Sequence, residues 1–396
     1  MANGEAISWV DGAGIVTATT IGAGILALPI ALYSFGTLGA TLILLSVGLL
    51  GLAAAFLLAE MLMRTDGVTH LPSLVDAYLG KPGLALIFAG TLVYIYGALT
   101  AYLIAGGALA ESLSGGRVPS YVGTLAYFAI VTAIVHGGAG VVKGAEKASL
   151  VVLLVLSLLI IALALPHSGL VAGTAGVEDI PAAFGVVLFA CFAHEVIPSV
   201  RNRMRKDVRG FIKALIVGAA IPVALYIAWT AVFIGAIPGP LLAAAGVAGQ
   251  PATVPLGIVA GSLAILLGSM FAVFSTGSSY VGSSFGLVDV FTDLFGDIHR
   301  RLGKELALLF SVLPPLYVAV EAPHGFVKAL EIAGIYGGGV AIGIVVPLAY
   351  LVARRKGRRK PEFSIPSPLG EILAVVLFGV TLAMLIYETY SLLSGM

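Results

Sequence analysis

The sequence predicts an all-α membrane protein with eleven transmembrane helices. Of its 396 residues, 59% are hydrophobic and 10% are charged, whereas a soluble domain carries about 25% charged residues. So few charges could not solvate a surface in water, but the exterior of a protein in lipid can be apolar too. The formal net charge of +1 gives no reason to expect nucleic acid as a partner. We therefore predict a single transmembrane domain over residues 1–396, with the lipid bilayer around it.

Eleven segments are long and apolar enough to be transmembrane spans. Crossing about 30 Å of hydrocarbon takes about 20 mostly apolar residues in a helix. The eighth segment is longer than one crossing requires, and the ninth is short and contains Pro314-Pro315. We expect the first to be retained rather than cleaved as a signal peptide, because no basic region or cleavage site precedes it. The predicted spans are 10–35, 38–63, 84–112, 121–139, 147–165, 181–201, 211–236, 257–291, 304–321, 325–352 and 369–392.

Lysine and arginine gather in alternate loops. If the N-terminus is cytoplasmic, all 21 of these residues except Arg117 and Lys328 fall in inside loops. Because this bias sets the orientation of membrane helices, we expect a multi-pass protein of the plasma membrane with a cytoplasmic N-terminus and an extracytoplasmic C-terminus. The runs at 201–206 and 353–360 are interpreted as topogenic charge, with specific lipid binding as the alternative.

The first span contains a predicted break in its helix. Gly22 and Gly24 flank Ala23, and Pro29 follows. Glycine lacks the Cβ that disfavours irregular backbone, and non-helical backbone inside a membrane is tolerated only beside protein or a watery cavity. A half-helix that begins near Gly24 would direct free N–H groups and its positive dipole end at the break, which suits a carboxylate. The alternative is close helix packing by small residues.

The sixth span predicts a second break. It places Cys191, His194 and Glu195 in or just below mid-membrane, with Pro198 after them. An ionisable residue inside a span is costly and indicates a functional site. The alternative is a histidine satisfied by a neighbouring helix and a glutamate that reaches water. Five spans separate the two breaks, so each opens one five-helix half, and paired breaks of this kind indicate the substrate site of a transporter.

Four ordered motifs resemble those of one family. These are TTIGAGILALPIAL in the first span, HEVIPSV in the sixth, SSYVGSSFGLVDVFTDLF in the eighth, and LPPLYVAVEAPHGF with the residues up to Pro347. They resemble the aromatic and hydroxy amino-acid permeases, in the amino acid/auxin permease group of the amino acid-polyamine-organocation superfamily. The resemblance implies a five-plus-five inverted repeat of the leucine-transporter type with helices 1 and 6 broken. Its parts would be repeat one at 10–165, repeat two at 181–352 and an extra helix at 369–392.

The resemblance also implies a substrate site at the two breaks. The N–H groups of Ala23 and Gly24 would hold a substrate carboxylate, and carbonyls at both breaks would receive its ammonium group. Tyr94 or Tyr96 of the third span would line the side-chain pocket, with a lipid-facing or core position as the alternative. The implied substrate-binding residues are Ile21, Gly22, Ala23, Gly24, Tyr94, Phe192, Ala193 and His194.

The coupling ion is predicted to be a proton or sodium. The fold's common sodium site uses carbonyls of the first span and hydroxyls of the eighth, and oxygen ligands suit a hard cation. Yet the named permeases are usually described as proton-driven. A carboxyl shielded from water takes up a proton more readily, so Glu195, with His194, is the candidate proton carrier; pairing with 201–206 is the alternative. The implied sodium ligands are Ala18, Ile21, Ser275, Ser278 and Ser279, and no other cofactor is expected.

These features predict a cation-coupled symporter of aromatic or small neutral amino acids that works by alternating access. The sequence has no Gly-x4-Gly-Lys-Ser/Thr loop for an ATP-driven pump. A membrane amino-acid sensor and, less favoured, an intramembrane enzyme are the alternatives. Two further charges are interpreted separately. Glu60 should pair with Arg64 at i,i+4 spacing, and Glu331 lies about two turns inside its span, where a gating contact is one interpretation.

Overall fold

The computed structural model describes residues 6–65, 70–137, 139–204, 206–294, 300–357 and 359–394. Every regular element in these ranges is helical, which confirms the all-α prediction. The elements are α1 (Trp9–Thr20), α2 (Gly24–Leu32), η1 (Tyr33–Phe35), α3 (Gly36–Arg64), α4 (Leu71–Leu113), α5 (Ser120–His136), α6 (Ala139–Ala164), η2 (Leu165–His167), η3 (Val177–Asp179), α7 (Ile180–Ala190), η4 (His194–Val196), α8 (Ile197–Arg203), α9 (Val208–Ala236), α10 (Gly239–Val247), α11 (Thr253–Ala260), α12 (Ser262–Leu294), α13 (Arg300–Glu321), α14 (Phe326–Ile332), the π-helix η5 (Ala333–Val345), α15 (Val346–Lys356) and α16 (Leu369–Ser394).

Nine helical stretches in the described ranges are long and apolar enough to cross a membrane. The two predicted spans that fall short are the first and the fourth. The first is divided into α1, with 12 residues, and α2, with nine. The fourth is α5, which is apolar but has 17 residues. The stretch that is counted near the N-terminus begins at Gly24 and continues through α3 to Arg64. The predicted break therefore separates α1 from it and accounts for one of the two differences.

Two predicted spans have different limits in the structure, in both cases at a glycine with positive φ. The eighth span begins at Ser262 rather than at 257, because Gly261, at φ 81°, separates α11 from α12. The third span continues back to Leu71 through a bend at Gly80, where φ is 63°. Only glycine adopts this region readily. The Pro314-Pro315 pair, by contrast, lies inside the continuous helix α13.

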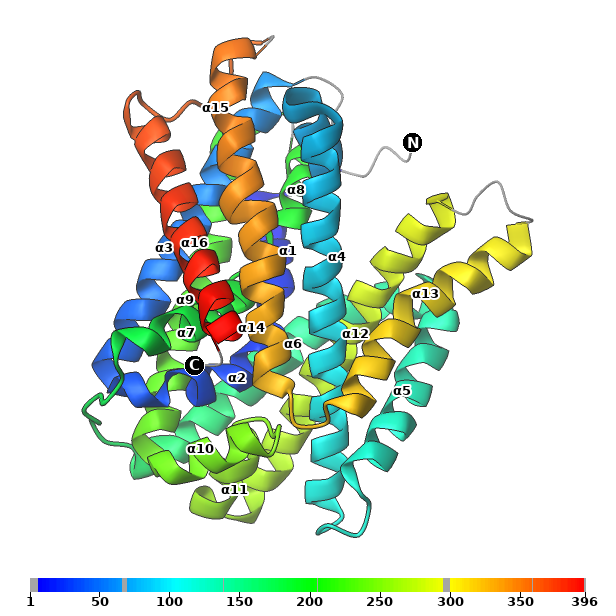
Figure 1. Ribbon diagram of the computed structural model, residues 1–396, viewed down its shortest axis with the longest axis vertical. Coiled ribbons are helices and arrows are strands. Elements are labelled where there is room, and N and C mark those ends of the chain that lie inside the picture. The colour runs from blue at the N-terminus through cyan, green and yellow to red at the C-terminus, as the bar shows by residue number, and fades with distance from the viewer. Residues whose placement is uncertain are drawn as a thin grey trace.

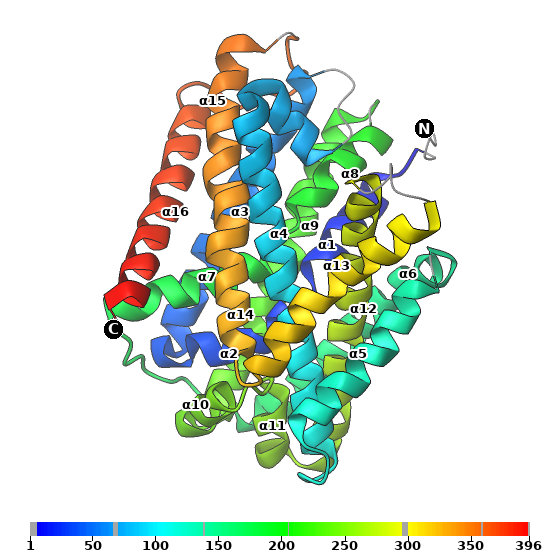
Figure 2. The same cartoon turned by 45° about the vertical axis from the view of Figure 1, so that its right-hand side comes forward.

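The helices form two groups that meet along α4. In one group, α1 and α3 both pack on α9, and α7 packs on α2. In the other, α5, α6 and α13 pack around α12 and form an inclined layer (Figure 2). The run α14–η5–α15 is one continuous rod between α4 and α16 (Figure 1). The short helices α10 and α11, which the sequence analysis did not anticipate, lie at the end opposite α8 (Figure 1).

A buried ion cluster surrounds Glu60 on α3. The predicted pair with Arg64 is present, at 2.7 Å between Nη2 and Oε1. Glu60 also accepts from Arg354 Nε of α15 at 3.1 Å, from Tyr350 Oη at 3.1 Å and from the Ile365 N–H at 2.8 Å. Its side chain is fully buried, and a buried carboxylate is tolerated when it is paired and hydrogen-bonded. The cluster therefore fastens α15 and the segment after it to α3.

Candidate functional site

Both predicted helix breaks are present. Helix α1 ends at Thr20 and α2 begins at Gly24, with non-helical backbone between them. Helix α7 ends at Ala190, and winding resumes at His194 in the 3-10 turn η4 before α8. No side chain caps the start of α2. Its first N–H groups therefore lack a side-chain acceptor at the break, as the first turn of a helix leaves such groups unpaired.

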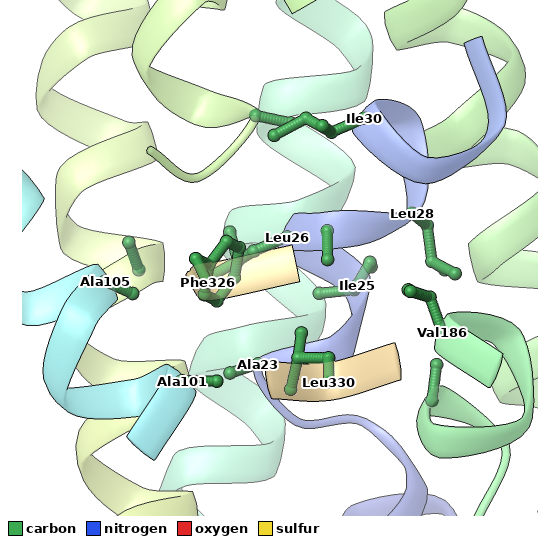
Figure 3. Close-up of a cluster of buried hydrophobic side chains, with 14 of the residues drawn as sticks. Ala23, Ile25, Leu26, Leu28, Ile30, Ala101, Ala105, Val186, Phe326 and Leu330 are labelled. Carbon is green, nitrogen blue, oxygen red and sulfur yellow. The ribbon is translucent and has the colours of Figure 1, made fainter. Parts of the chain in front are cut away.

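The two breaks lie against each other. A Cβ added to Gly24 would be 3.0 Å from both the Cα and the Cβ of Ala190, so only glycine lets the start of α2 approach the end of α7 this closely. Figure 3 shows the same contact continuing outward, with Val186 of α7 beside Leu28 of α2. The free N-terminal groups of one half-helix and the C-terminal carbonyls of another thus meet in one place.

A tyrosine that the sequence analysis did not single out joins the two broken ends. The Tyr226 hydroxyl, on α9, is 2.6 Å from the carbonyl oxygen of Thr20 and 3.2 Å from that of Ala190. Its single hydroxyl hydrogen is shared between the last carbonyl of α1, which is closer, and the last carbonyl of α7. Tyr226 is fully buried. A lone tyrosine inside an apolar span was the available signal, since a buried tyrosine hydroxyl needs a partner.

Aromatic rings stack beside the second break. Tyr94 of α4 lies between Phe189 and Phe192, with ring centroids 4.9 Å and 4.2 Å away. The π-helix η5 makes room for them, because a Cβ on Gly338 would lie 3.1 Å from the Phe192 ring. Tyr94 therefore lies beside the second break. Tyr96 does not, because its hydroxyl donates to the Phe310 carbonyl of α13 at 2.6 Å.

His194 is held by a neighbouring helix on one side. Its Nε2 is 3.0 Å from the Gly51 carbonyl oxygen of α3, while its buried Nδ1 has no partner among the described residues. The histidine lines a cavity of about 30 Å³ together with Thr20 and Cys191. A water needs about 10–15 Å³ of such space, so this cavity has the size for water and not for an amino acid.

Glu195 is surrounded by protein, as expected of a shielded carboxyl, yet solvent still reaches it. Its side chain is exposed, and in the described part of the chain it forms no ion pair. The proposed pairing with the 201–206 run is not found there; Arg201 instead lies 4.0 Å from Glu362. Glu195 interacts electrostatically with the hydroxyls of Tyr94 and Tyr102 on α4. It therefore lies near α4, on the α8 side of the break.

The three serine hydroxyls predicted to bind sodium lie in three different surroundings. Ser279 Oγ is 3.0 Å from where a Cβ of Gly22 would be, so it reaches the first break. Tyr102, which the sequence analysis did not name, is hydrogen-bonded to Ser279. Ser275 is buried, and its Oγ has no partner in the described ranges. Ser278 is exposed and donates to the Phe274 carbonyl of its own helix at 2.7 Å.

The sequence model of the tryptophan/tyrosine permease family matches residues 6–386. The chain belongs to this family. Among its relatives, tyrosine-specific transport system 2 of Haemophilus influenzae is 28% identical over 362 residues, which cover 85% of this chain and 86% of that protein. Tyrosine-specific transport system 1 of the same organism is 26% identical over 92% of this chain and 93% of that protein. Its tryptophan-specific transport protein is 24% identical over 94% of both.

Membership of the tryptophan/tyrosine permease family bears out the broad predictions. It supports a multi-pass membrane protein that transports amino acids rather than an intramembrane enzyme.

A serine motif of hydrolases also occurs in the sequence, but its local structure is not that of an enzyme site. Gly282-Ser283-Ser284-Phe285-Gly286 has the Gly-x-Ser-x-Gly spacing of a hydrolase elbow, which requires a sharp turn from strand to helix. Here the five residues lie inside helix α12 and Ser284 is fully buried, so this serine is not presented as a nucleophile.

The contact between the breaks gives a first prediction for this permease. Gly24→Ala would place a methyl group 3.0 Å from the Ala190 Cα, and overpacking of this kind costs about 1–3 kcal/mol. We expect substrate affinity to fall roughly tenfold, since about 1.4 kcal/mol corresponds to a factor of ten. Gly14→Ala is the matched control, because its Cβ would meet nothing within 4 Å. Equal affinities of the two variants in a binding assay would contradict the prediction.

Proposed function

We propose that this permease imports tyrosine or tryptophan, recognised as a zwitterion at the two breaks, together with a proton or sodium. The observation that carries the proposal is the contact of two interrupted membrane helices at Gly24 and Ala190. Non-helical backbone at membrane depth is tolerated only beside protein or a watery cavity. The names of the tyrosine-specific and tryptophan-specific relatives support an aromatic substrate.

The opposed helix ends match the two charges of an amino acid. The substrate carboxylate would accept from the N–H groups of Ala23 and Gly24, at the positive dipole end of α2. Its ammonium group would donate to carbonyls near Ile21, Phe192 and Ala193, at the negative ends of α1 and α7. The Tyr94 stack supports an aromatic side-chain pocket, because aromatic rings favour offset stacking with one another.

The coupling cation has two candidate positions. Sodium would be held by hydroxyl and carbonyl oxygens, which a hard cation prefers; the unpartnered Ser275 Oγ and the position of Ser279 at Gly22 fit such a site. Ala18, Ile21 and Ser278 complete the proposed set. A proton would be carried by Glu195 with His194 beside it. Glu195 faces α4 and is exposed, so it can exchange a proton with water.

Alternating access would open the breaks first to one side and then to the other. Eight of the nine residues of α2 are buried, against five of the twelve residues of α1. This asymmetry supports a conformation that is closed on the α2 side and less tightly packed on the α1 side. We place the α1 side in the cytoplasm, in line with the distribution of lysine and arginine, in a plasma-membrane permease with a five-plus-five inverted repeat and eleven crossings.

Uptake into proteoliposomes tests the proposed function. We expect labelled tyrosine or tryptophan to accumulate under an imposed proton or sodium gradient, and the gradient that drives accumulation identifies the cation. Binding without accumulation would instead favour a sensor. If the proton gradient drives uptake, Glu195→Gln should abolish the proton-driven part while leaving exchange of labelled for unlabelled substrate intact. Full pH-driven uptake by Glu195→Gln would reject Glu195 as the carrier.

A further inference from the structure

A second charged cluster lies far from Glu195, on the α2 side of the breaks. Lys328 and Glu331 lie one turn apart on α14, and Glu388 lies on α16. The Lys328 Nζ is 2.5 Å from Glu331 Oε1 and 2.8 Å from Glu388 Oε1. The side chains of Glu331 and Glu388 are 7% and 8% exposed, whereas that of Lys328 is 44% exposed. The cluster thus joins α14 to α16, and the Lys328 side chain is its solvent-accessible member.

The cluster has one more carboxyl than it has cations. Glu331 and Glu388 both lie within 2.8 Å of the same Lys328 Nζ, so their carboxyl groups are close neighbours. Two carboxylates that share one site repel each other, and a carboxyl pair of this kind favours holding one proton. With that proton the three side chains are neutral overall. Without it a net negative charge stays buried within membrane-spanning helices, where unpaired charge is costly.

No other charged group among the described residues balances this excess. The ionic and hydrogen-bond interactions of the three side chains are with one another. Neither α2 nor α7, which pack on α14, has a titratable side chain within its bounds. On η5, Tyr336 is bonded to Thr389 at 3.0 Å. The remaining titratable side chains on the packed elements, away from the α8 end, are Tyr94, Tyr96, Tyr102 and Glu111 on α4 and Tyr387 and Tyr390 on α16.

The opposite face of α14 covers the substrate site. Phe326 and Leu330 are fully buried. Figure 3 shows Phe326 beside Ala105 of α4 and Leu26 of α2, and Leu330 beside Ala101 and Ala23. Ala23 is the residue whose N–H is assigned to the substrate carboxylate. A change in the contact between α14 and α16 would therefore directly alter the packing at the first break.

We propose that Glu331 and Glu388 bind one exchangeable proton, and that this proton keeps α14 closed over the breaks. When the proton leaves to water past Lys328, the buried negative charge favours release of α14 from α16 and opening toward the outside. Uptake of a proton from outside restores closure. The inference deepens the proposed function, since it makes proton binding and outer closure one event, and it assigns the proton a site distinct from Glu195.

Thiol labelling tests the proposal without any transported substrate. In a Cys191→Ser background, Ala105→Cys places a thiol beneath Phe326, where an impermeant maleimide reaches it from outside only when α14 opens. We compare labelling rates with and without Glu388→Gln, from mildly acidic to mildly alkaline pH. The intrinsic reactivity of the thiol changes with pH equally in both proteins. The ratio of their labelling rates therefore depends only on the state of the charged cluster. The rate in the protein that keeps Glu388, divided by the rate in Glu388→Gln, is expected to rise with pH, since only the former has two carboxyls that share one proton beside Lys328.

The controls keep the result interpretable. Glu178→Gln neutralises an exposed glutamate just before α7 and should give a ratio that does not vary with pH. Leu330→Cys is a second reporter position under α14, used if the first variant does not elute as a folded monomer. A pH-independent ratio for Glu388→Gln at both positions would overturn the proposal, even if tyrosine or tryptophan uptake is fully intact. Failure of uptake with a pH-dependent ratio would reject the proposed function instead.

Discussion

Replacing Tyr226 by phenylalanine is expected to reduce uptake roughly thirtyfold or more. The substitution removes the hydroxyl that donates to the carbonyls of Thr20 and Ala190. Each buried carbonyl left unpaired costs about 1–3 kcal/mol, and about 1.4 kcal/mol corresponds to a factor of ten. Because these carbonyls end the two half-helices, their loss of a partner should disturb the geometry that receives the substrate ammonium group.

Initial rates of labelled tyrosine and tryptophan uptake measure this effect. Tyr96→Phe is the matched control, since it also removes a hydroxyl that donates to a backbone carbonyl, that of Phe310 at 2.6 Å, but away from the breaks. We expect Tyr96→Phe to retain uptake within about threefold, because an ordinary hydrogen bond contributes about 0.5–1.5 kcal/mol. Similar rates for the two variants would show that Tyr226 does not organise the site.

Glu60→Gln is expected to cause the largest loss of stability in the chain. It removes a fully buried charge that pairs with Arg64 and Arg354 and accepts from Tyr350 and Ile365. Removing one partner of a buried ion pair costs about 3–5 kcal/mol, because the other charge stays buried without compensation. The segment that follows α15 should loosen first, since Glu60 holds its backbone at Ile365.

Thermal unfolding in detergent measures the change in stability. Asp76→Asn serves as the control, because Asp76 lies 3.6 Å from Lys81 and both side chains are exposed. An exposed pair contributes about 0–1 kcal/mol. If the Glu60→Gln and Asp76→Asn proteins unfold at the same temperature, the cluster around Glu60 does not hold α3 and α15 together.

The helix breaks could be predicted from residues that are close in sequence, whereas contacts between residues far apart in sequence could not be predicted. Gly22, Gly24 and Pro29 indicate an interrupted helix, because glycine and proline act on the backbone within a few residues. The pairing of Glu60 with Arg64 follows from helical spacing alone. Arg354 pairs with the same carboxylate from 294 residues later in the chain, a contact that depends on the fold rather than on local sequence.

The same distinction explains the site residues that were missed. Tyr226 is the one tyrosine of α9 and Tyr102 is one of four on α4, and nothing in the neighbouring sequence indicates that they reach Ala190 and Ser279. Conversely, the depth of Glu195 in the span indicates shielding by protein. That solvent still reaches its side chain depends on the direction of the side chain at an irregular break, which helical periodicity does not give. Glu388 acquires its role only through the packing of α16 on the rod that contains Lys328.

A structure determined with bound tyrosine or tryptophan tests the central claim most directly. The account predicts the substrate carboxylate within about 3 Å of the N–H groups of Ala23 and Gly24, with the ammonium group on carbonyls near Ile21 and Phe192. The aromatic ring should lie on the α4 side of the breaks. A ligand bound elsewhere, or one whose carboxylate is held by a lysine or arginine side chain, would contradict recognition by the two interrupted helices.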